Sequence, residues 1–135
     1  MNDQQRYYFR KEDKLKSRKA IEQLFAQGRS FSNFPFRVVW TTGNEKATLQ
    51  AGVGVSNRNF KKAVDRNRIK RLMREAYRLQ KNELQQHLKE KERSMSVFFL
   101  YQGKELPRYE DVFEKIGTAI KRLIKLSNEN TESHS

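Results

Sequence analysis

Residues 65–81 limit the possible folds most strongly, because apolar and cationic side chains each repeat there with the period of an α-helix. At ~100° per residue, apolar side chains spaced three and four apart lie on one side of a helix. These side chains are Ile69, Leu72, Met73, Ala76 and Tyr77. The opposite side carries Asn67, Lys70, Arg71, Arg74, Arg78 and Lys81. We therefore expect a helix that has Asp65 as its N-cap and packs its apolar side on the rest of the chain.

The charge of this segment indicates a partner for its polar side. Residues 58–74 contain eight Lys or Arg and one acid, Asp65. Charged helix faces are usually only solvated, but like charges three and four residues apart destabilise a helix, and only Glu75 interrupts this run. The whole chain of 135 residues has a net charge of +13. Such a charge favours a polyanionic partner, either nucleic acid or an anionic membrane surface.

The composition argues against membrane insertion and against cysteine chemistry. No apolar run approaches the ~18 residues that a transmembrane helix needs, and residues 1–10 lack the apolar centre of a signal peptide. We therefore expect a cytoplasmic protein without membrane contact. The chain has no cysteine, so it can form neither a disulfide framework nor a thiolate zinc site.

The residues that usually carry catalysis do not gather in the sequence. His87 and His134 are far apart, and the carboxylates are dispersed without the spacing of metal ligands. The glycine patterns that bind nucleotide phosphates are also missing. We therefore expect no catalytic residue and no metal site in the protein itself, which would act by binding.

The remaining sequence predicts a small α/β domain. Ser17 can cap a helix over 18–27 that ends at Gly28. A short extended piece follows around Phe31. Alternating or continuous apolar residues then predict strands over 36–42, 47–56 and 95–101, and an amphipathic pattern predicts a last helix over 109–126.

The order of these elements, αβββαβα, predicts a two-layer α/β sandwich of the α+β kind with a mixed sheet. We expect the long helix to weaken near Lys81 and Asn82, and its continuation to Lys91 to bury little. One domain should cover 15–127, between a flexible basic and aromatic arm over 1–14 and a disordered tail over 128–135.

Several stretches carry a family resemblance. Residues 66–77, RNRIKRLMREAY, follow the segment GVGVS at 52–56. Upstream lie Leu15-Lys16-Ser17, Leu24-Phe25 and Gly28-Arg29-Ser30. In this order they resemble the bacterial ribonuclease P protein subunit, the basic partner of a catalytic RNA, over roughly residues 9–124. The loop between Ser56 and Arg66 is slightly longer than in the common form of the motif.

The resemblance implies a function in tRNA maturation. In that family the ribonuclease P RNA hydrolyses the phosphodiester bond, using Mg²⁺ ions that are bound mainly by the RNA itself. The protein contacts this RNA and the 5′ leader of precursor tRNA. The resemblance also implies a left-handed βαβ crossover, although such crossovers are right-handed in ≈ 98% of cases.

The residues expected to bind RNA are Arg58, Lys61, Lys62, Arg66, Asn67, Arg68, Lys70, Arg71, Arg74 and Arg78. Asn67 either bridges a backbone group and a phosphate or orders the loop before the helix.

The resemblance further implies a groove for the single-stranded leader, between the first helix and the sheet. Its expected residues are Ile21, Phe25, Arg37 and Val39. Phe25 stands at an aromatic position of the family. Ile21 and Val39 stand where the family has two other aromatics.

Three other functions compete with this one. A ribosomal or other structured-RNA-binding protein would share the charge and the fold, but it has no need of the RNR run after a GVGVS segment. A DNA-binding module would need a helix-turn-helix partner for the basic helix, and the sequence offers none at close spacing. A metal-dependent nuclease would need a cluster of ligands that the sequence does not contain.

Overall fold

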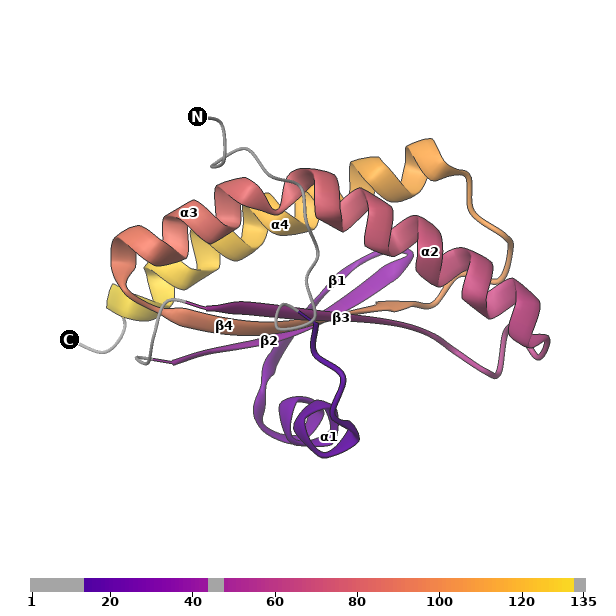
Figure 1. Ribbon diagram of the computed structural model, residues 1–135, viewed down its shortest axis with the longest axis horizontal. Helices are drawn as coiled ribbons and strands as arrows, with labels where there is room; N and C mark the ends of the chain where they lie inside the picture. The colour runs from indigo at the N-terminus through magenta and orange to yellow at the C-terminus, as the bar shows by residue number, and fades with distance from the viewer. Residues whose placement is uncertain (1–13, 44–47, 133–135) are drawn as a thin grey trace.

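The computed structural model describes residues 14–43 and 48–132, with side chains as far as residue 128. Within these residues the chain forms one mixed sheet with helices on both of its faces (Figure 1). The elements in chain order are α1 (Arg18–Gln27), β1 (Arg29–Asn33), β2 (Phe36–Gly43), β3 (Leu49–Val55), α2 (Ala63–Gln80), α3 (Asn82–Lys91), β4 (Ser94–Tyr101) and α4 (Tyr109–Glu132).

The strands are arranged in the order β1-β2-β4-β3. β2 is antiparallel to both β1 and β4, whereas β3 runs parallel to β4. The expected mixed sheet and α+β sandwich are therefore confirmed, and the apolar run of β4 is central as predicted. The chain passes from β3 to β4 through α2 and α3, and the handedness of this crossover stays a prediction.

The two faces of the sheet pack on different helices. α2, α3 and α4 cover one face, and α1 covers part of the other (Figure 1). Because successive residues of a strand point to opposite faces, Val97 and Phe99 of β4 join the main core, whereas Phe98 lies beneath α1. The cluster on the α1 side consists of Leu15, Leu24, Val39 and Phe98. The prediction that this strand is covered on both faces is thus confirmed.

The predicted first helix is confirmed at both ends. The Ser17 Oγ accepts a hydrogen bond from the backbone N–H of Ala20 at 3.3 Å, which satisfies one of the free N–H groups of the first turn. At the other end the N–H of Gly28 donates to the Leu24 carbonyl at 2.7 Å. α1 is therefore a short helix with defined ends, and Leu24 anchors it on the sheet.

The expected N-cap of the basic helix is wrong. α2 begins at Ala63 with Lys62 as its N-cap, and the N–H of Arg66 already donates to the Lys62 carbonyl at 3.2 Å. Asp65 lies in the first turn instead, where a carboxylate is stabilised by the positive end of the helix dipole. The earlier start was not readable because Ala63 and Val64 are exposed, so no apolar period marks them.

The segment after Lys81 buries more than its sequence suggested. The chain breaks at Lys81, as expected, and α3 then continues to Lys91. Leu84 and Leu88 are fully buried in the main core, and α3 packs along α4. The expectation that this stretch buries little is therefore wrong, because α4 supplies the apolar surface that the local sequence does not show.

The last helix is longer than predicted. α4 reaches Glu132 rather than ending near 126, so it enters the segment 128–135 for which we expected disorder. Residues 133–135, and residues 1–13 of the expected arm, lie outside the described residues. The division of the chain into an arm, one domain and a tail stays a prediction.

Candidate nucleic-acid interface

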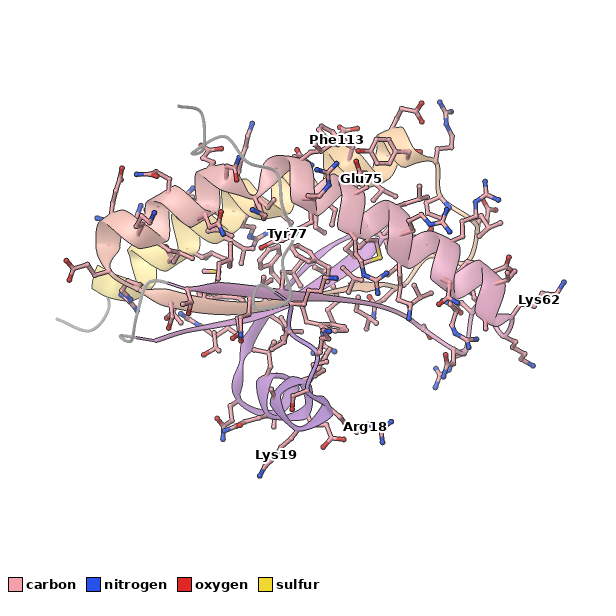
Figure 2. The ribbon with its side chains drawn as sticks, viewed as in Figure 1. Arg18, Lys19, Lys62, Glu75, Tyr77 and Phe113 are labelled. Carbon is pink, nitrogen blue, oxygen red and sulfur yellow. The ribbon has the colours of Figure 1, made fainter. Side chains whose placement is uncertain are left out.

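The outer side of α2 carries the cations that the sequence placed there. Ile69, Met73 and Tyr77 are buried against the sheet, and Tyr77 points toward it in Figure 2. On the other side Arg68, Arg71 and Arg74 are exposed and Lys70 is partly exposed. In the described part of the chain, none of these four cations, which we call the ridge, pairs with a carboxylate. Asn67 is exposed beside them.

Two further cations, Arg78 of α2 and Lys81 directly after it, are less available than expected. Arg78 pairs with Glu75: its Nη2 lies 2.6 Å from Oε2 and its Nε donates to Oε1 at 3.2 Å. The hydrogen bond from Arg78 lowers the pKa of the Glu75 carboxyl, and the same bond raises the pKa of Arg78. Lys81, predicted on the cationic side, is only 3% exposed. Its Nζ donates to Gln85 Oε1 at 3.2 Å, so its predicted place on that side is wrong.

The loop 57–62 brings more cations to the start of α2. Arg58, Lys61 and Lys62 are exposed, and Lys62 extends from the end of the helix (Figure 2). Within the loop Phe60 is buried, with its ring centroid 6.2 Å from that of Tyr101. The Nδ2 of Asn59 donates to the carbonyls of Gln102 and Gly103 at 3.1 and 3.2 Å. The loop is therefore fastened to the segment that follows β4.

Arg66, also expected to bind phosphate, turns partly inward. It is half-buried, and its Nη1 donates to the carbonyls of Phe60 and Lys61, each at 2.8 Å. Hydrogen bonds from a charged donor are short and strong. The first arginine of the RNR run thus holds the backbone of the preceding loop.

Tyr101 supports the segment to which this loop is fastened. Tyr101 is a buried residue, and its hydroxyl donates to the Glu105 carbonyl at 2.7 Å. Burial raises the pKa of the Tyr101 phenol above its ordinary value of 10.0, and the carboxylates of Glu105 and Asp111 raise it further. The folded protein therefore holds this proton more tightly than the unfolded chain does.

A pH dependence of stability follows from the raised pKa. The stabilisation from Tyr101 is complete below its unfolded pKa and is lost as the pH rises through the folded pKa. We expect Tyr101→Phe to lower the free energy of unfolding by about 1 kcal/mol at neutral pH, because one hydrogen bond is lost. Urea unfolding at about pH 8 and about pH 11 should show this difference shrink at the higher pH. An equal difference at both would contradict the assignment.

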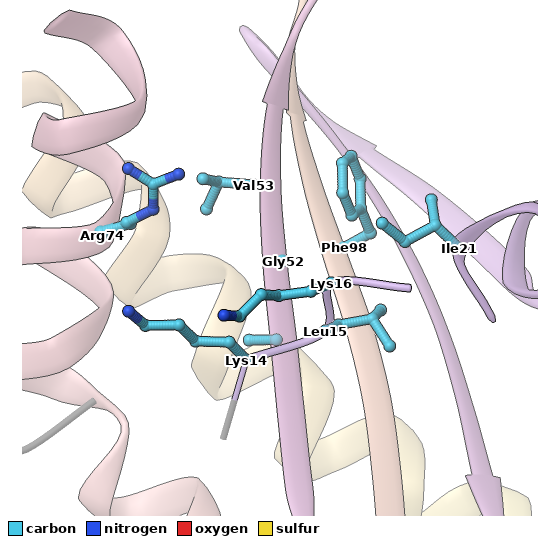
Figure 3. A pocket seen from close by; sticks show the side chains of 9 residues that line it. Lys14, Leu15, Lys16, Ile21, Gly52, Val53, Arg74 and Phe98 are labelled. Atoms are coloured by element: carbon cyan, nitrogen blue, oxygen red, sulfur yellow. The ribbon is translucent and has the colours of Figure 1, made fainter. Parts of the chain in front are cut away.

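A cavity of about 480 Å³ opens at the outer edge of β3, between α2 and α1. Arg74 of the ridge lines it from α2, and the side chains of Lys14 and Lys16 extend toward α2 from the segment beside β3 (Figure 3). Its apolar lining includes Ile21 of α1 and Phe98 of β4. We call this cavity the edge groove. It brings the cationic side chains of Lys14, Lys16 and Arg74 together with apolar surface beside β3.

The four residues expected in the leader groove are only partly brought together. Ile21 lines the edge groove. Phe25 is half-buried next to it, with its ring edge-on to Phe98 at a centroid distance of 5.3 Å, and the Cζ of Arg37 lies 5.8 Å from the Phe25 ring centroid. Val39 is 1% exposed beneath α1. Val39 thus packs between α1 and the sheet, and its contact with a leader stays a prediction.

Sequence reasoning missed Lys14, Lys16 and Phe98 as lining residues. The N–H of Leu15 donates to the Ala51 carbonyl at 2.9 Å, which fixes this segment beside β3. The two lysines beside the Ser17 cap are a local signal, but their approach to β3 depends on residues more than thirty positions away. That approach is not visible in the local pattern.

Gly54 leaves room for the ring of Phe98. A Cβ at this position would lie 2.7 Å from Phe98 Cζ. We expect Gly54→Ala to push the ring toward Phe25 and to cost about 1–3 kcal/mol of stability, as overpacking generally does. Gly43→Ala is the matched control, because among the described residues a Cβ there would meet only Ser94 Oγ, at 2.9 Å, and this hydroxyl can rotate away. Equal stability of the two variants in urea unfolding would contradict the expected crowding.

The described residues offer two further negative findings. None of the helices in this part of the chain combines the length and the apolar character needed to cross a membrane. The same residues contain no cluster of three or more His, Asp or Glu side chains that could bind a metal ion.

Known proteins resemble this chain in sequence and in fold. The family model described as Ribonuclease P matches residues 9–124. The ribonuclease P protein component of Porphyromonas gingivalis is 38% identical over 104 residues, 76% of each chain, and that of an Exiguobacterium species is 40% identical over 70 residues, 52% of this chain and 60% of the relative. The solved structure of Staphylococcus aureus RNase P protein, at 21% identity, shares the fold with a TM-score of 0.58 over 82% of this chain and 94% of its own. This chain belongs to the ribonuclease P protein family.

Proposed function

We propose that this protein is the protein subunit of a bacterial ribonuclease P. It binds the ribonuclease P RNA through the ridge and the loop 57–62, and it binds the 5′ leader of precursor tRNA in the edge groove. The observation that carries the proposal is the position of Arg74, which belongs to the ridge and also lines the edge groove. A structured RNA bound to the ridge of α2 and a single-stranded leader bound beside β3 would therefore both contact Arg74.

The ridge suits the backbone of a structured RNA. Binding to phosphates releases condensed counterions, so the affinity should fall steeply with salt and depend little on sequence. Arg68, Arg71 and Arg74 can each offer two parallel N–H donors to a phosphate, which a lysine cannot reproduce. The apolar side of α2 is buried against the sheet, so the cations of the ridge lie on the side of this helix that a partner can reach. We propose RNA rather than DNA as that partner.

The chemistry would belong to the RNA. Phosphodiester hydrolysis by ribonuclease P needs Mg²⁺, and we propose that the RNA holds these ions, as the family resemblance implies. The contribution of the protein would be electrostatic. Cations of the ridge lower the repulsion between phosphates of the RNA and of the substrate, so fewer Mg²⁺ ions are needed to bring them together.

The edge groove suits a single strand because it joins cations to apolar surface. Lys14, Lys16 and Arg74 can follow the phosphates, while Ile21 and Phe98 can contact a base or a ribose. Single-stranded nucleic acid is generally held in this way, by a positive groove with apolar or aromatic contacts to the bases. The leader would then run along the edge of β3, with Phe25 at one end of its path.

Comparison of precursor tRNA with mature tRNA tests this function, and Phe25→Ala makes the test specific. We expect the complex of protein and RNA to bind precursor tRNA more tightly than mature tRNA. Loss of the Phe25 ring should weaken precursor binding by about 1–3 kcal/mol, the usual contribution of an aromatic contact to a base. Mature tRNA has no leader, so its affinity should not change.

Phe34→Ala is the matched control for this variant. Phe34 is 74% exposed in the turn between β1 and β2, so its ring is removed without loss of packing. Thermal unfolding of both variants separates lost binding from lost folded protein. A folded Phe25→Ala protein that keeps the parent's preference for precursor tRNA would exclude Phe25 from the leader path.

A further inference from the structure

The loop 57–62 has a defined shape in the protein alone. At its start, Ser56 accepts hydrogen bonds from the N–H groups of Arg58, through Oγ at 3.2 Å, and of Phe60, through its carbonyl at 3.3 Å. Three further side chains hold the loop, and none of them is one of its exposed cations. Phe60 is 7% exposed and packs on Tyr101. Asn59 donates to two carbonyls of the segment after β4, and Arg66 donates to two carbonyls of the loop. The loop is therefore held by packing on the core, by hydrogen bonds to the segment after β4, and by hydrogen bonds from the first turn of α2.

The contacts of Arg66 differ from those of a phosphate ligand. One guanidinium nitrogen, Nη1, donates to both Phe60 and Lys61 at 2.8 Å. These carbonyls lie just before the helix, where the chain has no helical hydrogen bonds of its own to hold it. By contrast, Arg71 is exposed five residues further along the same helix. Two arginines of one motif thus have different surroundings, and we infer different tasks from them.

We propose that Arg66 and Asn59 are positioning residues of the RNA interface. They hold the loop so that Arg58, Lys61 and Lys62 are presented in place before RNA arrives. Binding usually costs conformational entropy when side chains and loops become ordered, and a preformed surface avoids that cost. Arg66 acts mainly through the three cations of the loop rather than through a phosphate of its own. This inference rests on the proposed function, because it requires that the loop meets RNA.

The two possible tasks of Arg66 make different predictions for a double-mutant cycle. A residue that positions the loop loses its effect when the loop has no cations left to present. If Arg66 instead binds a phosphate independently, its removal lowers the affinity by the same factor whether or not the loop is charged, because the effects of distant sites are generally additive. The neutral partner Asn59 makes the distinction sharper, since its removal changes no charge.

The experiment measures the affinity of the full chain for a bacterial ribonuclease P RNA in two backgrounds. One is the parent, and the other, which we call the loop-neutral variant, combines Arg58→Gln, Lys61→Gln and Lys62→Gln. We expect Arg66→Ala to weaken binding about tenfold in the parent, the scale of ordering a short loop. In the loop-neutral variant the same substitution should weaken binding less than about twofold.

Arg71→Ala and Asn59→Ala complete the design. Arg71→Ala should weaken binding by the same factor in both backgrounds. Asn59→Ala should behave like Arg66→Ala, and it keeps the test decisive if Arg66→Ala does not fold. The positioning role would be overturned if Arg66→Ala lowered the RNA affinity by the same factor in both backgrounds. The same holds for Asn59→Ala if it is used in place of Arg66→Ala. If the parent itself shows no salt-dependent affinity for the RNA, the proposed function fails rather than this inference.

Discussion

Replacement of all four ridge cations, Arg68, Lys70, Arg71 and Arg74, by Gln should weaken binding to ribonuclease P RNA by roughly a thousandfold at low salt. The plot of log affinity against log salt should become shallower by about 0.7–0.9 for each phosphate contact that is lost. Glutamine is a good helix former, and the change removes repulsion between like charges. Thermal unfolding should therefore show a folded protein of at least the parent's stability.

A matched variant with the same change in net charge controls for general electrostatics. Lys89, Lys91, Lys121 and Lys125 are exposed on α3 and α4, and all four can be replaced by Gln. This variant should keep most of the affinity and most of the salt dependence. Equal losses in the two variants would mean that the charge of the whole chain binds RNA and that the ridge is an ordinary solvated helix face.

The second large effect is expected in the core, at Leu84. This residue is fully buried where α3 packs on α4. Leu84→Ala removes apolar contacts and leaves a cavity, which generally costs about 2–5 kcal/mol. The total stability of a small domain is only roughly 5–15 kcal/mol, so urea unfolding should show a large decrease in the free energy of unfolding.

Leu79→Ala is the control for this prediction. It makes the same chemical change at a residue of α2 that is 36% exposed. It should cost well under half as much as Leu84→Ala, because less apolar surface returns to water. Folded Leu84→Ala protein should still bind RNA like the parent, since the residue is remote from the ridge. Similar stability losses from the two substitutions would contradict the packing of α3 on α4.

Local patterns predicted those parts of the fold whose causes are local. The Ser17 cap and the Gly28 end of α1 are properties of neighbouring residues, and the apolar period of α2 is visible within a few turns. The central position of β4 followed from its continuous apolar run. In each of these cases a single element and its solvent exposure were enough to predict the structure.

The parts that sequence reasoning missed depend on contacts between distant segments. Leu84 lies in a polar stretch and is buried only because α4 runs beside it. Val39 faces away from the main core, and α1 covers it from the other side of the sheet. Lys14 reaches the edge groove because its neighbour bonds to Ala51. No local period encodes which segment will cover a given face.

The candidate site shows the same division. The cationic side of α2 was readable from spacing alone. The spacing also permits an ion pair between Glu75 and Arg78, but only the structure shows that Arg78 adopts it. The inward bonds of Arg66 were not readable either, because they depend on the path of the loop 57–62. Charge alone does not distinguish an arginine that binds a phosphate from one that holds the backbone.

Cleavage of precursor tRNA by a bacterial ribonuclease P RNA, with and without this protein, tests the central claim most directly. The RNA alone should need high Mg²⁺. Addition of the protein should produce the mature 5′ end at Mg²⁺ concentrations where the RNA alone is inactive, and the protein without RNA should cleave nothing. Cleavage by RNA-free protein that survives nuclease treatment and repurification, or an unchanged Mg²⁺ requirement in its presence, would contradict the account.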